Sequence, residues 1–377
     1  MSERYKFVDM NETGPGAVRT AFANQVAYCR AAEAPITARI VAAVATLLDR
    51  PETGFARRIA NWPGAALADA LPLRAAGGLH ALHLSGAADD LAPIYADADD
   101  INDAAIVAGV VRRHEAALLP WLDGPPQTNE AGRSANFIAA MLWLADQGLP
   151  ARFECLEIGS SAGINLMLDR YHYDLGGVQV GPQPGVMAFT PDWQGRHPPQ
   201  HATEIASTKG CDVAPVDLTD SAQALRLKAF VWPEHAIRFA RIEAAIAAAE
   251  ARPPDLVRMN AADFVEQELA KPQAAGTTRL LMHSIVWQYV PADQQARVTA
   301  AMEAAGARAT ADRPLAWVAL EANRTVHGHE LVVRHWPGGA VPVMLARAPP
   351  HGAWIEWLVY PRTFRKRKVI ARAAATR

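Results

Sequence analysis

Apolar residues in the first 150 positions recur at intervals of three and four residues. These stripes run through Phe22, Val26 and Cys29; Ile40, Val44, Leu47 and Leu48; Val107, Val111, His114 and Leu118; and Phe137, Met141 and Leu144. The spacing is typical of amphipathic helices, and Pro and Gly residues at 62–64, 77–78 and 124–126 separate them. The pattern predicts an all-helical N-terminal domain over residues 1–126.

The pattern changes after Pro150. Strand candidates occur at 153–158, 256–259, 280–286, 315–320, 330–335 and 354–360, and helices are predicted after Gly163, Pro233 and Pro291. Strands that alternate with helices indicate an α/β fold with a mostly parallel sheet covered on both faces. Residues 171–205, rich in aromatics, Gly and Pro, suggest a hairpin-rich insertion. We therefore predict a second domain over 127–362, followed by a basic tail at 363–377.

Composition and charge narrow the class of protein. Half of the 377 residues are apolar and one-fifth are charged, which is ordinary for a globular protein. The net charge of −2 argues against a nucleic-acid surface, and no apolar run approaches the ~20 residues of a membrane span. Three widely spaced cysteines indicate neither disulfides nor a metal site. We expect a cytoplasmic protein that binds a small molecule and neither nucleic acid nor membrane, with substrate and oligomeric state left open.

The most informative segment is 154–165, ECLEIGSSAGIN, which predicts a buried strand, a tight turn and a helix. The spacing Glu157-x-Gly159-x-x-x-Gly163 resembles the cofactor loop of class I S-adenosylmethionine-dependent methyltransferases. The same segment, Gly159-x-Ser161-x-Gly163, also matches the nucleophile elbow of α/β-hydrolases. A hydrolase elbow follows several strands of its sheet, whereas everything upstream here is predicted to be helical. The order of elements therefore favours the methyltransferase interpretation.

Two alternatives stay open. A serine esterase would use Ser161 as its nucleophile and would need an acid and then a histidine, for which Asp263 and His351 stand in the required chain order. A non-catalytic nucleoside-binding module would keep the fold without the transfer.

Several further segments resemble a known family. They are 128–134 (TNEAGRS), 209–217 (KGCDVAPVD), 231–234 (VWPE), 283–286 (HSIV) and 351–354 (HGAW). Together with the loop, they make residues 128–360 resemble a bacterial family of uncharacterised proteins, domain of unknown function 2332. The resemblance implies a Rossmann-like, methyltransferase-type sheet preceded by a helical cap. Ser161 departs from the usual methyltransferase loop, because it replaces the middle glycine and narrows the space for the methionine part of the cofactor.

The methyltransferase resemblance implies a role for the loop in binding S-adenosylmethionine. Glu157 would face the cofactor's amino group, since a buried carboxylate at a strand end needs a partner. The N–H groups near Ser161 and Ala162 would donate to the ligand. The cradle itself would consist of Gly159, Ser160, Ser161 and Gly163.

In such a sheet, one acid ends the second strand, which would lie between Gly163 and residue 256, and another acid follows the strand at 256–259. Both would bind the nucleoside. Asp212 fits an acid that accepts hydrogen bonds from the ribose hydroxyls, and Asp174 is the alternative. Asp263 would meet the adenine amino group, with Phe264 beside the ring. The simpler interpretations are a turn aspartate for Asp212 and a helix N-cap for Asp263.

Polar residues before the strand at 153–158 and at the end of the strand at 280–286 complete the predicted site. Thr128 or Asn129 would cap the helix that leads into the first strand, and Asn129 also lies close enough in sequence to join the cofactor site. Arg133, one turn further, would bind a carboxylate.

His283 and Ser284 end the fourth strand, where His283 would accept a proton from the methylated group. Tyr289 follows on the next loop as part of a substrate wall. A core histidine hydrogen-bonded to backbone is the alternative for His283.

Overall fold

The computed structural model describes residues 11–323, 328–338 and 340–359, so the predicted basic tail lies outside the described residues. The chain divides into two compact units. One comprises Met1–Thr128 with Asp220–Ile242, and the other Asn129–Thr219 with Glu243–Arg377. The sequence pattern placed the stretch 220–242 in the α/β domain, but its contacts place it in the first unit.

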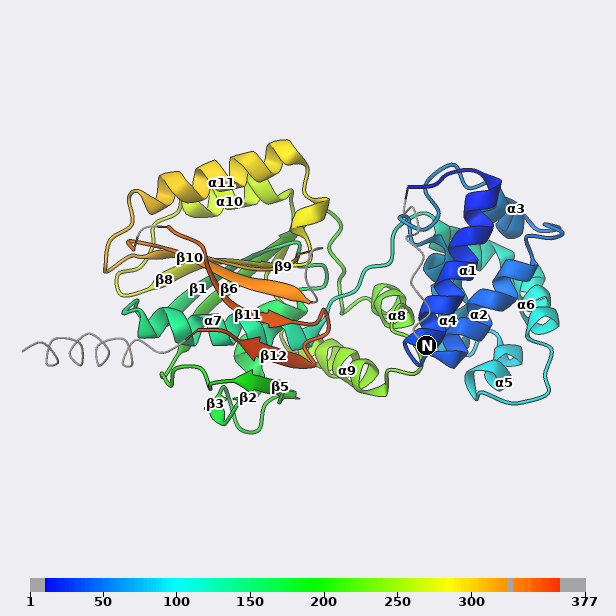
Figure 1. Cartoon of the computed structure of the whole chain (residues 1–377), viewed down its shortest axis with the longest axis horizontal. Helices are drawn as coiled ribbons and strands as arrows, with labels where there is room; N and C mark the ends of the chain where they lie inside the picture. The colour runs from blue at the N-terminus through cyan, green and yellow to red at the C-terminus, as the bar shows by residue number, and fades with distance from the viewer. Residues whose placement is uncertain (1–10, 324–327, 339, 360–377) are drawn as a thin grey trace, which may run out of the picture. The chain divides into compact units, whose positions relative to one another are not determined.

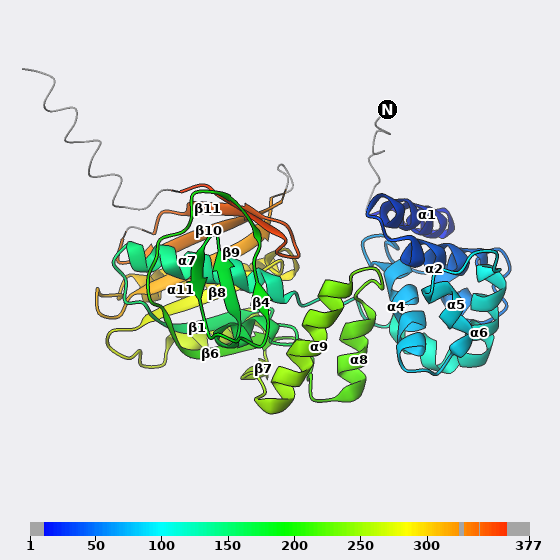
Figure 2. The same ribbon diagram turned by 90° about the horizontal axis from the view of Figure 1, so that it is seen from below.

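The first unit is helical, as the apolar stripes predict. Its elements are α1 (Pro15–Ala31), α2 (Pro35–Thr46), α3 (Gly54–Ala60), α4 (Leu71–Leu84), η1 (Asp89–Leu91), α5 (Ala92–Tyr95), α6 (Asp103–Leu118), η2 (Leu119–Leu122) and α8 (Ser221–Ala229). Proline begins α1 and α2, while Thr53 and Asn102 cap α3 and α6 with their side chains. Within this unit α2 packs against α1, α4 and α6, as Figure 2 shows.

The second unit is built on a nine-stranded sheet with the order β5-β12-β11-β10-β9-β8-β1-β6-β7. The strands are β1 (Arg152–Ile158), β5 (Asp192–Gly195), β6 (Glu204–Asp212), β7 (Leu256–Arg258), β8 (Thr278–Ser284), β9 (Leu315–Ala322), β10 (His329–Trp336), β11 (Val343–Ala348) and β12 (Trp354–Trp357). Neighbouring strands are parallel along the stretch β9-β8-β1-β6-β7 of this order. The pairs β9–β10, β10–β11 and β11–β12 are antiparallel. The sheet is thus mostly parallel, as predicted.

Helices cover both faces of this sheet. Figure 1 shows α10 (Ala261–Leu269) and α11 (Ala292–Gly306) on one face and α7 (Ser134–Asp146) on the other. All of α7 from Ser134 to Ala145 is buried, so its side chains are packed on every side. The remaining helical segments are η3 (Ala131–Arg133), η4 (Ile164–Arg170), η5 (Trp287–Tyr289) and α9 (Ala236–Ala251), which spans the boundary between the units. No helix in the described part of the chain is long and apolar enough to cross a membrane.

The structure differs from the predicted elements in three places. The helix expected after the loop is the 3₁₀ segment η4, in which Leu166 N–H donates to the Gly163 carbonyl. The insertion forms a small sheet of β2 (His172–Leu175), β3 (Val178–Val180) and β4 (Ala188–Phe189), and its β5 joins the edge of the main sheet. Two strands were given no range in the sequence analysis. For β6 only the end at Asp212 was predicted, because its residues are mostly polar, and β11 was missed because it lies in a Pro-rich and Gly-rich stretch.

Candidate functional site

The order in which the chain adds parallel strands to the sheet reverses at β1. From β1 the chain builds outward through β6 and β7, then returns to the other side of β1 with β8 and β9. In open α/β sheets, ligands bind at the carboxyl ends of the strands at such a switch point. The last residues of three strands meet there: Glu157 and Ile158 of β1, Asp212 of β6, and Ser284 of β8.

The loop after β1 has a strained backbone and is bonded within the protein. Gly159 has a φ of 67°, and a Cβ there would overlap the side chain of Val286, so the position requires glycine. Ser161 has a φ of 53°, which is unusual for a residue with a side chain. Its N–H donates to Asp212 Oδ2 at 2.8 Å. The prediction that the Ser161 N–H is free for a ligand is therefore wrong, because the loop is closed on the end of β6.

Asp212 ends β6, the neighbour of β1, which is the position predicted for the ribose acid. Its carboxylate accepts hydrogen bonds from the N–H groups of Ser161 and Ala214, each at 2.8 Å. A carboxylate has about four acceptor positions, so each oxygen retains one. The alternative acid, Asp174, accepts from Gly177 N–H in the small sheet.

Glu157 is the most unusual carboxyl group of this edge. It is 1% exposed, and its Oε1 accepts a hydrogen bond from Asn165 Nδ2 at 3.3 Å. Its Oε2 is buried with no hydrogen-bond partner. Burial raises the pKa of Glu157 to about 7. The polar side chains of Ser160 and Asn165 and the charge of Arg133 lower this pKa, but by less than burial raises it. A half-satisfied buried carboxyl group is costly unless something bonds its second oxygen.

The segment before α7 reaches this edge, but not as a helix cap. No side chain caps α7; instead Asn129 Oδ1 accepts a hydrogen bond from the N–H of Ile164, which follows the loop, at 2.9 Å. The predicted capping role of Thr128 or Asn129 is therefore wrong. Arg133 is 6% exposed; its Nε donates to the Pro350 carbonyl at 2.8 Å.

His283 lies at the end of β8 as predicted, but neither of its ring nitrogens is open. Its Nδ1 donates to Glu321 Oε1 at 2.6 Å, and its Nε2 accepts from Trp317 Nε1 at 2.9 Å. The ring is 2% exposed and stacks on Trp287. The prediction that His283 accepts a proton is thus contradicted by its bonding. It is a core histidine, although its partners are side chains rather than backbone.

The adenine residues and the substrate wall are placed differently from the prediction. Asn260, not Asp263, caps α10, and Asp263 is half-exposed in an ion pair with Arg297 at 2.7 Å. Phe264 is buried in the apolar core beneath α10 and α11, so its ring is not available to stack on a ligand. Tyr289 is 74% exposed.

The esterase alternative lacks its hydrogen-bond relay. The Oγ of Ser161 is buried with no hydrogen-bond partner. Asp263 is bonded to Arg297 and Asn260, whereas His351 faces Glu130, so the acid and the histidine are not paired with each other.

Sequence reasoning did not place several polar residues, among them Glu321, His329 and His351, at this edge. Strands β9 to β11 bring Glu321, His329 and Ala348 to it, because Ala322 pairs with His329 and His329 pairs with Ala348. The following turn carries His351, whose Nδ1 lies 3.6 Å from Glu130 Oε1. The signal was present in the segments 128–134 and 351–354, but nothing in the sequence shows that they meet.

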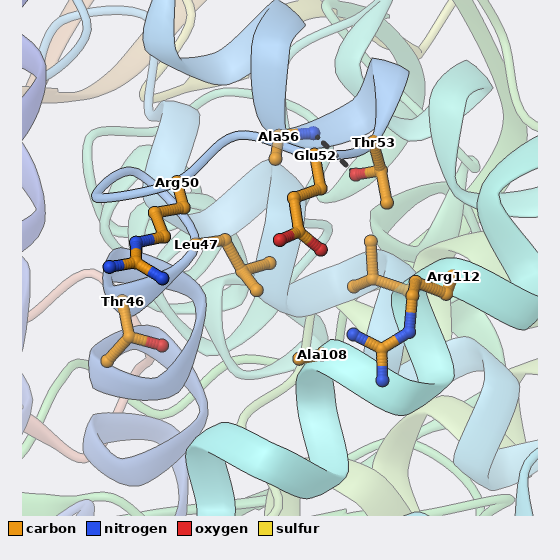
Figure 3. A pocket seen from close by; sticks show the side chains of 9 residues that line it. Thr46, Leu47, Arg50, Glu52, Thr53, Ala56, Ala108 and Arg112 are labelled. Atoms are coloured by element: carbon orange, nitrogen blue, oxygen red, sulfur yellow. Dashed lines mark hydrogen bonds between the residues drawn. The ribbon is translucent and has the colours of Figure 1, made fainter.

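Two cavities lie elsewhere. One of about 180 Å³ lies in the helical unit, where Figure 3 shows Arg50, Glu52 and Arg112 around it. The other, of about 140 Å³, is lined by Lys271, Arg279, Arg308 and Arg313, residues beside the amino ends of β8 and β9. Neither contains a predicted site residue.

A family model described as "Uncharacterized protein conserved in bacteria (DUF2332)" matches residues 19–357. The chain belongs to this family. The family match begins well before residue 128, so the helical unit is part of the family and not an addition to it. No curated protein and no solved structure matches the chain.

Proposed function

We propose that the α/β unit binds S-adenosylmethionine at the carboxyl ends of β1, β6 and β8 and transfers its methyl group to a small molecule or protein. The order β7-β6-β1-β8-β9 agrees with that of doubly wound, Rossmann-like nucleotide-binding sheets. The antiparallel strands β10 to β12 extend this order by three strands.

The observation that carries the proposal is the unpartnered oxygen of Glu157. A buried carboxyl group with one open acceptor, at the switch point of a parallel sheet, suits a cationic ligand that also donates hydrogen bonds. The ammonium group of S-adenosylmethionine has both features. Glu157 would hold the ammonium group, and Asp212 would accept from the ribose hydroxyls with the acceptor positions that the loop leaves open.

Two asparagine side chains hold Glu157 and the end of the loop in place. Asn165 donates to Glu157, and Asn129 fixes the first residue after Gly163. When bound, the cofactor supplies an electrophilic methyl group. The chain supplies the acids that position it, and the side chains of Glu157, Ser160 and Asn165 are buried and therefore shielded from water.

Isothermal titration with S-adenosylmethionine and S-adenosylhomocysteine tests the proposal. We expect both to bind, and Glu157→Gln to raise the Kd about ten- to 150-fold, because a charge-assisted hydrogen bond contributes about 1.5–3 kcal/mol. Glu250→Gln, on the exposed face of α9, removes the same charge outside the site and is the control. No binding of either compound at millimolar concentration contradicts the proposal. Binding without transfer would identify a non-catalytic nucleoside-binding module.

A further inference from the structure

Two histidine–glutamate pairs lie at the carboxyl edge of the sheet. They differ in whether the histidine nitrogen that faces away from the glutamate has a hydrogen-bond partner. In the pair of His283 with Glu321, Trp317 occupies the second nitrogen. In the pair of His351 with Glu130, Nδ1 lies 3.6 Å from the carboxylate oxygen Oε1, an ion-pair distance slightly too long for a hydrogen bond, and no residue in the described part of the chain bonds to Nε2. The His351 side chain is 44% exposed, whereas Glu130 is 5% exposed. Of these two histidines, His351 is therefore the one that a substrate can reach.

The turn that carries His351 is held in place by its backbone. Gly352 has a φ of 70°, and a Cβ there would overlap the carbonyl of Gly132. Arg133 Nε donates to the carbonyl of Pro350, one residue before His351. Since the turn is fixed on the segment that contains Glu130, the histidine and its carboxylate are set in place together.

The same segment joins His351 to the switch point. Arg133 Nη1 lies 3.5 Å from Ser284 Oγ at the end of β8, and its charge lowers the pKa of Glu157. His329, at the start of β10, interacts electrostatically with both Arg133 and His351. We call Glu130, Arg133, Ser284, His329 and His351 the edge cluster.

We propose that His351 is the proton acceptor of this site and that Glu130 is its positioning residue. The inference rests on the proposed function for its chemistry, and it assigns the substrate class as a neutral hydroxyl or amine. A lone pair of that group forms a bond to the methyl carbon, the carbon–sulfur bond breaks with its electrons going to sulfur, and the proton goes to His351 Nε2. The carboxylate of Glu130, 3.6 Å from Nδ1, favours the tautomer with hydrogen on Nδ1 and stabilises the imidazolium that forms.

Labelling with diethyl pyrocarbonate near neutral pH, followed by mass spectrometry, tests this role, because the reagent modifies an imidazole nitrogen with a free lone pair. His201 is an internal reference of similar exposure: its side chain is 37% exposed and lies 3.5 Å from Asp146. We expect Glu130→Gln to slow labelling of His351 at least about threefold and to leave His201 unchanged, because the fixed tautomer is lost. Glu130→Asp, which keeps the carboxylate, should restore part of the rate.

A second arm asks whether His351 faces the ligand site. Saturating S-adenosylhomocysteine should slow labelling of His351 and not of His201, and His351→Asn should leave the Kd of this ligand within about twofold of wild type. Equal labelling of His351 in Glu130→Gln and wild type overturns the inference, as does binding of S-adenosylhomocysteine that leaves His351 labelling unchanged. Absence of binding in the titration overturns the proposed function, and the Glu130 variants then still decide the pairing of His351.

Discussion

Replacing Glu157 by Gln is expected to change how stability depends on pH. Burial raises the pKa of this carboxyl group from its ordinary 4.5 to about 7. Between these values the group is ionised in the unfolded chain and neutral in the native protein, so the native state binds more protons and the free energy of unfolding falls as the pH rises. The loss is absent below about pH 4.5 and complete above about pH 7.

The magnitude follows from the size of the shift. Each pKa unit corresponds to about 1.4 kcal/mol, so ionisation of Glu157 costs the native protein about 3 kcal/mol at neutral pH. Glutamine has the shape of the protonated group, and its amide oxygen can still accept from Asn165. Glu157→Gln should therefore match wild type in acid and become more stable than wild type by about 3 kcal/mol above about pH 7.

Urea unfolding of both proteins at several pH values measures this difference. All other titrating groups are shared, so they cancel when the two free energies of unfolding are subtracted. Glu250→Gln tests whether loss of one surface charge has the same effect. A difference between Glu157→Gln and wild type that stays constant from about pH 4.5 to 8 would refute the reasoning, because the carboxyl group would then titrate alike in both states.

Two further predictions concern stability. Gly352→Ala should lower the free energy of unfolding by about 1–3 kcal/mol, since it adds a Cβ at positive φ against Gly132; a urea midpoint equal to wild type would contradict this. Burial of His80, hydrogen-bonded to Ala229, lowers its pKa to about 4, so the helical unit should lose about 3 kcal/mol as the pH falls from about 6.5 to 4. His80→Gln should abolish this loss in acid unfolding curves, and an unchanged curve would count against it.

The local sequence pattern predicted which helices and strands form better than it predicted which residues they contact. The stripes through Phe22, Val44 and Val107 are buried in the helical core, and the strand candidates at 153–158 and 315–320 are strands. Periodicity works here because it reports only which side of an element is buried. It failed for β6, whose polar residues do not alternate, and for the segment after Gly163, which is buried from Ile164 to Leu168 and folds as a 3₁₀ turn.

The candidate site shows a similar limit. Position along the chain placed Glu157 and Asp212 at the ends of adjacent strands, since a loop that follows a strand leaves its last residues at the carboxyl edge. It also placed His283 at the end of β8, but could not show that Trp317 and Glu321 occupy both of its ring nitrogens. The role of a side chain depends on its bonding partners, and those come from other strands.

By itself, the sequence determined an α/β unit with a helical partner, an acid at the end of the first strand, a tight turn after it, and a second acid on the neighbouring strand. Only the tertiary structure decided that Asp212 closes this loop, that Asp263 pairs with Arg297, and that Glu130 meets His351. The physical reason is range. Helix and strand patterns arise between neighbouring residues, whereas contacts such as that of Arg133 with Pro350 join residues 217 positions apart and exist only once the sheet has brought them to one edge.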